Sequence, residues 1–584
     1  MTRQPITIVE IDFPTCIRVF GTAPCTAALS ATTSRKCFNS RATCADSAHY
    51  DGTGTLTLRF AYNQTGIPGG MTIFPALESV STRPAELNLS GIDTSMSALG
   101  KRARVTVTIG DFAYHDTLTD PYQAERVSGA AQYGGAGYQP GQRGTFWGKH
   151  LARWPYYVGL PLRVLRGYVG DSLAAMDTAH YVIAELSGPG GDGRVTITAK
   201  DVLDLADNKK AVAPALSTGK LLSAITATDT TATLTPAGIG STYAASGLAC
   251  IGREVCGFTR SGDVLTLTRG REGTAAAAHA ALDTVQQCLV YADQRPCDVI
   301  SDLLVTYAGV PSSYIDATAW GLENDRWLSS IRLFRVLTKP TGVAALIGEI
   351  CQLGIMVWWD ETARKIRFRA NRPLDLDESA YPLSDAQNHL AGTIGLDRGD
   401  DMRLTAVMMF HGMIDPTQSA TDANNYARAA VASVTDDPYG QDAIKIICAP
   451  WLGAAGNDAV AASISTKLKN RYKTTPNLFT ATLDMKDRSG LSLGQIISVQ
   501  TRLMQDDTGA IDAEPMQVSY LEIKDDRLTI KAETWAFSGR FSFIAPYGVG
   551  GYGAATEEGK RVRGYIVSAA SLTFPDGTGP YILF

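Results

Sequence analysis

Short stretches in which apolar and polar residues alternate recur along most of this chain. Residues 55–62, 71–81 and 102–112 each alternate in this way, and Gly or Pro separates them. Alternation with a period of two predicts strands with one buried face, and the residues between them predict turns. The 56 glycines and 26 prolines agree with many short strands joined by turns. The pattern therefore predicts a mainly β protein.

Helical periodicity is found in the second half of the chain. Residues 297–309, 341–353 and 457–474 carry apolar residues at i, i+4 spacing, which predicts amphipathic helices. Gly354 follows the second of these and predicts its end. Residues 355–370 then predict a hairpin with a charged turn. Helices among strands indicate α+β domains in this part.

The length predicts several domains, because 584 residues exceed what one hydrophobic core usually organises. The expected fold class is multidomain and mainly β, with α+β domains, a small N-terminal segment rich in cysteine and an inserted small β module. The expected boundaries are 1–54 for the cysteine-rich segment, 55–212 for a β-rich domain, 213–294 for the module, 295–400 and 401–536 for two α+β domains, and 537–584 for a C-terminal arm.

Two Gly-rich stretches are expected to lie outside the compact domains. Residues 121–155 are rich in Gly, Gln and Tyr, which predicts a long loop that reaches a neighbouring subunit, or else a disordered loop tip. Residues 537–584 have strand-like ends but too little apolar volume for a domain. We interpret them as an arm that adds a strand to a neighbouring subunit.

Charge and targeting signals narrow the classes of function. The formal net charge is −5 and no run of basic residues occurs, which argues against a dedicated nucleic-acid binder. The first residues lack the apolar region of a signal peptide. The longest apolar run, 347–359, is too short to span a bilayer and is interrupted by polar residues. We therefore expect a protein that folds in a reducing cytoplasm, where disulfides are rare.

Four of the ten cysteines lie close together in the sequence: Cys16, Cys25, Cys37 and Cys44. In a reducing compartment such clustering favours metal ligation over disulfides. Structural zinc usually takes cysteines about two to four residues apart, and no such pair occurs here. An iron–sulfur cluster accepts thiolates from loops at longer intervals. Its negative charge would be offset by the basic residues of the same loops, which are Arg18, Arg35, Lys36 and Arg41. Zinc, and buried cysteines without a metal, stay open as alternatives at this point.

The cysteine spacing C-x8-C, a gap and C-x6-C resembles the iron–sulfur tail-tip protein of lambda-like siphophages and the hubs of related phages and gene transfer agents. Besides the cysteines, the residues that carry the resemblance are Phe38, Asn39, Arg41, Thr43, Asp46 and Tyr50. The resemblance implies a [4Fe–4S] cluster whose iron is bound by Cys16, Cys25, Cys37 and Cys44. In the lambda type the cluster belongs to a separate short protein, whereas here it opens a long chain, so its neighbours are left open.

The same resemblance implies a structural, non-enzymatic baseplate hub at the tip of a long flexible tail. Such a hub is assembled in the host cytoplasm and located in the virion. The expected partners are two further copies in a homotrimer, the distal tail protein ring, the tape-measure protein, and a central tail fibre or receptor-binding protein. The hub would gate the DNA channel and meet nucleic acid only transiently, during genome ejection.

Residues 250–288 resemble a small β module that recurs in phage tail proteins. The matching residues are Gly252, Glu254, Arg269, Gly270, Gly273, Thr274, His279 and Val285. Arg269 and His279 suggest a phosphate or metal site. A hydrogen bond that pins a loop is the preferred interpretation, since no second His or acidic partner accompanies them.

Signals for catalysis are weak. Residues 490–494 match the G-x-S-x-G of hydrolases, but a strand is expected after them where that motif needs a helix. Residues 188–193 match a dinucleotide-binding glycine motif, yet they link two strands. Asp201, Asp204 and Asp207 are expected on a solvated face, with calcium as the alternative. Two functions of another class stay as alternatives. An iron–sulfur redox protein predicts a flavin or second cluster motif, and a tail-associated cell-wall hydrolase predicts an acid/base constellation; neither is found.

Overall fold

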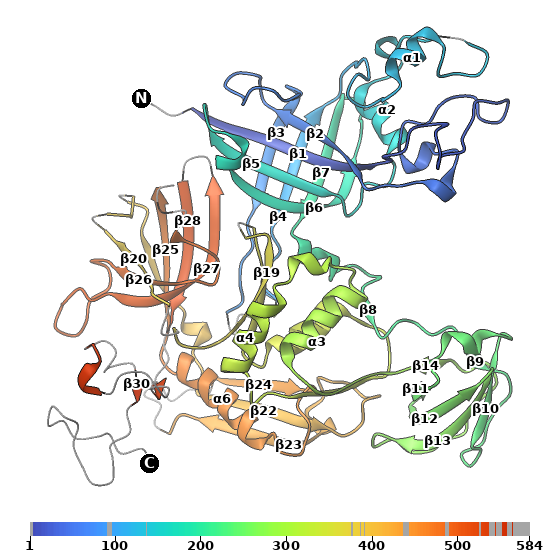
Figure 1. The fold of residues 1–584 in the computed structure, drawn as a ribbon. Coiled ribbons are helices and arrows are strands. Elements are labelled where there is room, and N and C mark those ends of the chain that lie inside the picture. Colours follow the sequence, from blue (N-terminus) through green and yellow to red (C-terminus); the bar gives the residue numbers. More distant parts are fainter. Residues whose placement is uncertain are drawn as a thin grey trace.

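The computed structural model describes residues 4–535 except 90–95, 98, 136, 362, 375–377, 386, 391, 436–442, 485–486, 488–489 and 525–526, and beyond them only 543–544, 552–556 and 563–564. Most of its elements are strands, which form several separate sheets (Figure 1). This confirms the prediction of a multidomain, mainly β fold. The domain boundaries themselves stay predictions.

The N-terminal region is one antiparallel sheet with the strand order β2-β1-β5-β6-β7-β4-β3. Its strands are β1 Pro5–Thr15, β2 Gly54–Ala61, β3 Leu77–Arg83, β4 Arg104–Gly110, β5 Pro161–Tyr168, β6 Asp177–Ser187 and β7 Arg194–Lys200. Alternation explains why they form: in β4, Val105, Val107 and Ile109 are buried, whereas Thr106 and Thr108 between them are half-buried. The long β1 runs from this core directly to Cys16.

The prediction of a long loop over residues 121–155 is wrong. This stretch contains two helices, α1 Gln123–Ser128 and α2 Phe146–Arg153. In α2 the side chains of Phe146 and Trp147 are buried in the core of the seven-stranded sheet, beside Trp154 just after the helix. These large aromatic side chains gain so much by burial that the Gly-rich composition around them does not keep the segment out of the core.

The inserted module has its own sheet, with the order β14-β11-β12-β13-β10-β9. The strands are β9 Lys220–Leu221, β10 Thr231–Thr235, β11 Ser246–Ile251, β12 Glu254–Ser261, β13 Val264–Arg271 and β14 Val285–Gln287. Their apolar side chains form a separate small core, which includes Leu234, Phe258 and Leu265. Figure 1 shows the module at the lower right, at the opposite end of the molecule from the seven-stranded sheet.

The centre of the molecule contains most of the helices, and the three predicted ones are confirmed. They are α3 Pro296–Asp302, continued by a π-helical turn Leu303–Tyr307, then α5 Val343–Cys351 and α6 Asp458–Tyr472. A further helix is α4 Ala317–Trp327. The predicted hairpin is also present, as β18 Ile355–Asp360 and β19 Lys365–Ala370. Short strand pairs join β15 Leu289–Gln294 to β16 Leu333–Leu337, and β17 Thr341–Gly342 to β8 Val212–Ala213.

Helix α6 covers one face of a three-stranded sheet with the order β23-β22-β24. Its strands are β22 Ala406–Met413, β23 Tyr426–Ser433 and β24 Ile444–Ala449. The hydrophobic core of this unit is continuous with that of the central helices. A second six-stranded sheet, β20-β26-β27-β28-β25-β21, has a core of its own. Its strands are β20 Tyr381–Ser384, β21 Gly395–Arg398, β25 Asn477–Asp484, β26 Ile496–Gln500, β27 Glu514–Lys524 and β28 Arg527–Thr534.

The predicted C-terminal arm lies largely outside the described residues. Of it the structure describes the pair β29 Phe543–Ile544 and β30 Arg563–Gly564, and a turn at Tyr552–Ala554. Within the part of the chain that is described, no helix is long and apolar enough to cross a membrane.

Candidate four-cysteine site

The four clustered cysteines come from the end of a strand and from the loops that follow it. Cys16 is the first residue after β1, and Cys44 ends a short 3-10 turn at Arg41–Thr43. Cys25 and Cys37 lie in the loops between them. All four thiols are free and half-buried. A rigid strand therefore sets the position of one thiol, while loops must place the other three.

Asn39 ties the loop of Cys37 to that of Cys16. Its backbone carbonyl accepts from the Cys16 amide at 2.6 Å, and its Nδ2 donates to the Cys16 carbonyl at 3.0 Å. The residue has φ +54°, in the left-handed region that Asn tolerates better than most residues. Both the conformation and the amide explain why Asn stands here.

Asp46 ties the loop of Cys25 to that of Cys44 in the same way. Its Oδ2 accepts from the amide of Thr26 at 2.7 Å and from the Thr26 hydroxyl at 2.9 Å. The backbone hydrogen bond from Thr26, with further ones from His49 and the Thr26 hydroxyl, lowers the pKa of Asp46 to about 2. Two polar residues thus hold the four cysteine loops together in two pairs.

The thiols of Cys37 and Cys44 lie near the other cysteines of the group. Burial raises the pKa of the Cys37 thiol, a backbone hydrogen bond from Asn39 lowers it, and the charges of Cys44, Cys25 and Cys16 raise it further. Burial likewise raises the pKa of Cys44, with added contributions from Cys16 and Cys25. Cys37 and Cys44 are therefore each within electrostatic reach of the other three thiols. That these four residues bind one metal group stays a prediction.

Two tyrosines flank the thiols. Burial raises the pKa of Tyr50, and the nearby thiols of Cys16 and Cys44 add to the effect. Burial also raises the pKa of Tyr122, where Cys37 and Cys25 are the neighbouring thiols. The Tyr122 hydroxyl accepts from the Phe20 amide at 2.8 Å. Tyr50 therefore lies near Cys16 and Cys44, and Tyr122 near Cys37 and Cys25.

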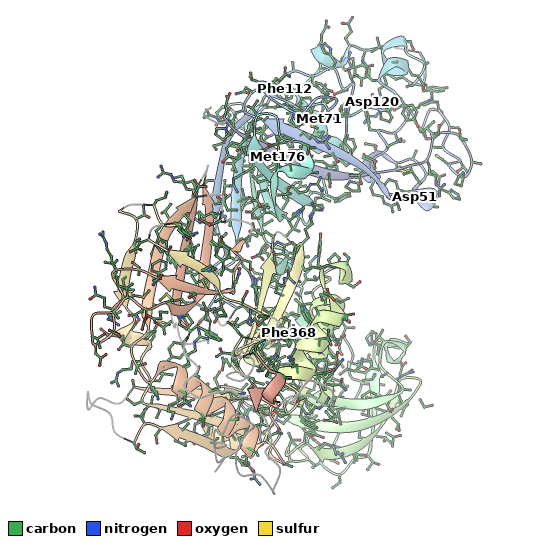
Figure 2. All side chains as sticks on the ribbon, turned by 60° about the vertical axis from the view of Figure 1, so that its left-hand side comes forward. Asp51, Met71, Phe112, Asp120, Met176 and Phe368 are labelled. Carbon is green, nitrogen blue, oxygen red and sulfur yellow. The ribbon has the colours of Figure 1, made fainter. Side chains whose placement is uncertain are left out.

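A buried arginine holds the loop that contains Cys37. Arg126 of α1 is fully buried; its Nε donates to Asp120 at 2.6 Å, and its Nη2 donates to the carbonyls of Lys36 and Cys37 at 2.9 and 2.7 Å. Its guanidinium lies 3.8 Å from the centre of the Phe38 ring, and that of Arg153 lies 4.0 Å from the same ring. Asp51 and Asp120, labelled in Figure 2, belong to the same end of the molecule. Sequence reasoning missed Arg126 and Arg153 because it assigned residues 121–155 to a loop, and it missed Asp120 immediately before them.

The basic residues expected around the site have mixed roles. Arg18 pairs with Asp51 at 2.9 Å and Lys36 with Glu125 at 2.6 Å. The guanidinium of Arg41 lies over the Tyr50 ring, and that of Arg35 over Phe38. Buried N–H groups of Arg18 (Nε) and Arg126 (Nη1) have no hydrogen-bond partner among the described residues. The surroundings thus contain several basic side chains, most of them paired, and two buried N–H groups without a partner among the described residues.

These surroundings can be compared with what different metal groups require. One tetrahedral zinc would hold its sulfurs about 3.8 Å apart, given a Zn–S bond of about 2.3 Å. Among the described residues, no three His, Cys, Asp or Glu side chains are placed to hold a single ion. A cubane cluster is wider, is bound by thiolates alone and carries net negative charge. Four thiols, with the Asp51 amide 3.5 Å from the Cys16 sulfur, offer the donor chemistry that such a group uses.

The other residues singled out in the sequence have structural roles. Glu254 of β12 is almost fully buried and accepts from Arg269 at 2.8 and 2.7 Å, from His279 Nε2 at 2.9 Å and from two backbone amides. Burial would raise the pKa of Glu254, but the hydrogen bonds from Arg269 and the other donors lower it overall. The predicted loop-pinning bond is present. The expectation that no acidic partner accompanies Arg269 and His279 is wrong, because the β12–β13 pairing brings Glu254 beside them.

The weak catalytic signals fall into turns. As predicted, a strand and not a helix follows residues 490–494, namely β26. The Ser492 hydroxyl lies 3.2 Å from Gln495 Oε1. Residues 188–193 form the β6–β7 hairpin loop, also as predicted. Asp201 is buried and accepts from the Ala103 amide at 2.9 Å, so the expected solvated face is wrong for this residue. The fold brings the β4 region over it. Asp204 and Asp207 form ion pairs with Lys200 and Arg102.

No known family profile and no curated protein sequence matches this chain. Several solved structures are similar in part. The 43 kDa tail protein of prophage MuSo2 from Shewanella oneidensis is 10% identical with a TM-score of 0.33, covering 78% of this chain and 93% of the other. A tail protein from Neisseria meningitidis MC58 is 10% identical with a TM-score of 0.35, covering 78% and 95%. Prophage tail protein gp18 from Listeria monocytogenes is 9% identical with a TM-score of 0.29, covering 79% and 91%. Similarity at this level assigns no function.

Proposed function

We propose that this chain is a structural subunit of a bacteriophage tail, of the baseplate-hub type, with a [4Fe–4S] cluster on Cys16, Cys25, Cys37 and Cys44. The observation that carries the proposal is that hydrogen bonds join the four cysteine loops in pairs, with Cys37 and Cys44 each within electrostatic reach of the other thiols. The residues that hold them together, Asn39 and Asp46, belong to the motif that resembles the tail-tip proteins. The resemblance thus has a physical basis in this chain.

The remaining motif residues act in the same place. The Phe38 ring lies against Arg126 and Arg153, and the Phe38 amide donates to the Thr43 hydroxyl at 2.9 Å. Arg41 donates to the Ser47 carbonyl at 2.9 Å and lies over Tyr50. A short motif in which every member supports one group of thiols favours a bound group over scattered buried cysteines.

The role proposed for the cluster is to hold loops together. Around the cysteines only a small apolar cluster forms, of Phe20, Tyr122 and Ala131 with a few partly buried neighbours. A structural metal group supplies bonds that so little buried apolar area does not. The protein's own part is to place four thiolates and to offer the N–H groups of Arg18 (Nε) and Arg126 (Nη1), which have no partner among the described residues.

An apolar sheet surface supports a role within an assembly. On the face of sheet β23-β22-β24 away from α6, the register places Ser433, Ala406 and Ile444 in one row, Val431, Met408 and Ile446 in the next, and Ala429, Phe410 and Cys448 in the third. We call these nine residues the open face. None of them is charged, and Val431, Ile444 and Ile446 are 59%, 51% and 58% exposed. An uncharged apolar face of this kind is typical of protein contacts.

In the proposed assembly three copies form a homotrimer. The expected neighbours are the distal tail protein ring, the tape-measure protein and a central fibre or receptor-binding protein, at the tip of the tail in the virion. Opening of the DNA channel during ejection would be the task of the whole assembly, with no reaction catalysed by this chain.

The first test is anaerobic purification followed by a visible absorbance spectrum and assays for iron and acid-labile sulfide. Wild type and Cys37→Ser are compared, with Cys448→Ser as a control that removes a cysteine far from the site. We expect iron and sulfide in wild type and in the control, and loss of both in Cys37→Ser. Colourless wild-type protein that holds zinc, or no metal at all, would overturn the cluster. Sedimentation analysis tests the trimer independently; a monomer at micromolar concentration would contradict it.

A further inference from the structure

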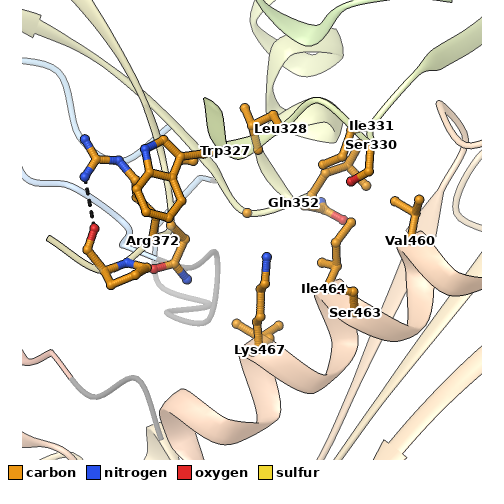
Figure 3. Close-up of a pocket in the computed structure, with 16 residues that line it drawn as sticks. Trp327, Leu328, Ser330, Ile331, Gln352, Arg372, Val460, Ser463, Ile464 and Lys467 are labelled. Carbon is orange, nitrogen blue, oxygen red and sulfur yellow. Dashed lines mark hydrogen bonds between the residues drawn. The ribbon is translucent and has the colours of Figure 1, made fainter. Parts of the chain in front are cut away.

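A recess lies between helix α6 and the central helices, far from the cysteines in the chain. Its lining comes from the end of α4 and the turn after it, from the end of α5, from the end of β19, and from the α6 residues Val460, Ser463, Ile464 and Lys467 (Figure 3). The recess has a volume of about 70 Å³. Since a water-sized group needs about 10–15 Å³, it has room for roughly five such groups.

The walls of the recess are apolar. Leu328, Ile331, Leu353, Ile464 and Leu468 line it and are all buried. They belong to the continuous central core, so their positions are set by packing. A ligand in this recess therefore meets a preformed surface that favours an aliphatic group.

The Lys467 amine is a cation of the recess that has no counter-ion among the described residues. Figure 3 shows the Lys467 side chain rising from α6 into the space between Trp327 and Gln352. Among the described residues, none forms an ion pair or hydrogen bond with its amine. The residue as a whole is exposed, and partial desolvation of the amine lowers the pKa of Lys467 without an opposing charge. A carboxylate placed here would supply the charge partner that the fold does not.

The second cation of the recess is already occupied. The Arg372 guanidinium donates to Glu323 at 2.7 and 3.0 Å and to Glu378 at 2.7 and 2.8 Å. It also lies over the Trp327 ring. Arg372 therefore shapes the wall, and Lys467 is the group left to bind an anion.

We infer that this recess binds a short aliphatic carboxylate, with the Lys467 amine as its counter-ion and the apolar wall around its hydrocarbon part. Gln352, Ser330 and Ser463 lie around the same space and can donate further hydrogen bonds to the carboxylate. The inference goes beyond the proposed tail function and does not depend on it. A free acid and a glutamate side chain of a partner protein share this chemistry.

The test measures binding of 3-methylbutanoate to the full chain by saturation-transfer NMR, with the neutral 3-methylbutanamide as the matched probe. Lys467→Met keeps the aliphatic stem and removes the charge. Lys469→Met, on the same helix but outside the recess, is the control, and Lys467→Arg keeps the charge. We expect Lys467→Met to weaken binding of the acid about tenfold or more, with little change in Lys469→Met and Lys467→Arg. Binding of the amide should be weak and equal in all four proteins.

The source of the carboxylate is distinguished with N-acetylglutamate amide and N-acetylglutamine amide. Lys467-dependent binding of the glutamate compound supports a partner's side chain as the ligand. Binding of 3-methylbutanoate alone supports a free small acid. If acid and amide bind equally to wild type, or if Lys467→Met binds the acid as well as wild type does, the inference is wrong. Equal thermal unfolding midpoints show that the variants are folded.

Discussion

The cysteine segment at residues 16–51 and the inserted module at 213–294 are both built from short elements and loops, but they are held together differently. The module has a small apolar core and closes its loops with Glu254, which gathers Arg269, His279 and two backbone amides. The cysteine segment has a much smaller apolar cluster, and its loops are joined by Asn39 and Asp46 around four thiols.

This difference is consistent with the bound group proposed for the cysteine segment. In the module the buried carboxylate of Glu254 pairs with Arg269 and His279 inside the chain. In the cysteine segment the charges of the thiolates oppose one another, and two arginine N–H groups stay unused in the described structure. The two regions therefore differ in how completely their buried donors and acceptors are matched, and the proposed cluster belongs to the region with unmatched donors.

The largest expected effect is loss of order in the cysteine segment alone. Cys25→Ser should remove the proposed cluster and leave residues 16–51 without protection from hydrogen exchange, because their apolar cluster is too small to hold the loops. Peptides of the module should keep wild-type protection. Exchange measured by mass spectrometry on anaerobic protein checks this. Wild-type protection of residues 16–51 in the variant would show that the loops are stable without the group.

A somewhat smaller effect is expected when the module loses its central charge. Glu254→Gln leaves the buried guanidinium of Arg269 without its carboxylate, which should lower the free energy of local unfolding of the module by about 3–5 kcal/mol. Exchange protection of peptides from β12 and β13 measures this. Glu272→Gln, an exposed acid in the same module, is the control and should change little. An equal loss in both variants would contradict the role of Glu254.

A buried carboxylate outside both regions, Asp201, should make the free energy of unfolding depend on pH. Asp201 accepts from one backbone amide only, and its Oδ1 has no partner among the described residues. Burial, partly opposed by Arg102, raises the pKa of Asp201 to about 6 from 3.8. Its stabilising contribution is therefore full below pH 3.8 and is lost as the pH rises through 6, by roughly 3 kcal/mol at most. Unfolding of wild type and Asp201→Asn is followed between pH 4 and 7. The pH dependence of the free energy of unfolding that comes from Asp201 should disappear in the variant. An unchanged dependence would mean that other groups cause it.

The smallest effect on stability is expected at the open face. Ile446→Lys places a charge on an exposed strand position, so the free energy of unfolding should change by about 0.5 kcal/mol or less. Self-association, however, should weaken clearly if this face lies in a contact between copies. Sedimentation compares self-association of wild type, Ile446→Lys and the control Leu322→Lys. Leu322 is exposed on α4. Unchanged association in Ile446→Lys would place the contact elsewhere.

Much of the local structure could be predicted from the sequence because it depends on neighbouring residues. The alternation in β4 and the helical spacing in α6 and α5 were sufficient to identify these elements. The segment 121–155 was assigned wrongly for the opposite reason. Its Gly-rich composition suggested a loop, while the burial of Phe146 and Trp147 depends on a sheet made by strands on both sides of it.

What the sequence by itself determined was a mainly β chain with a group of four cysteines and a module pinned by polar residues. Only the tertiary structure decided which side chains meet: Arg126 donates to the Cys37 carbonyl, and Glu254 accepts from both Arg269 and His279. It also decided that Lys467 has no counter-ion among the described residues. The physical reason is the range of the interactions. Strand and helix patterns arise within a few residues, whereas charge pairing and burial are set by segments tens to hundreds of residues apart, whose approach depends on the packing of the whole chain.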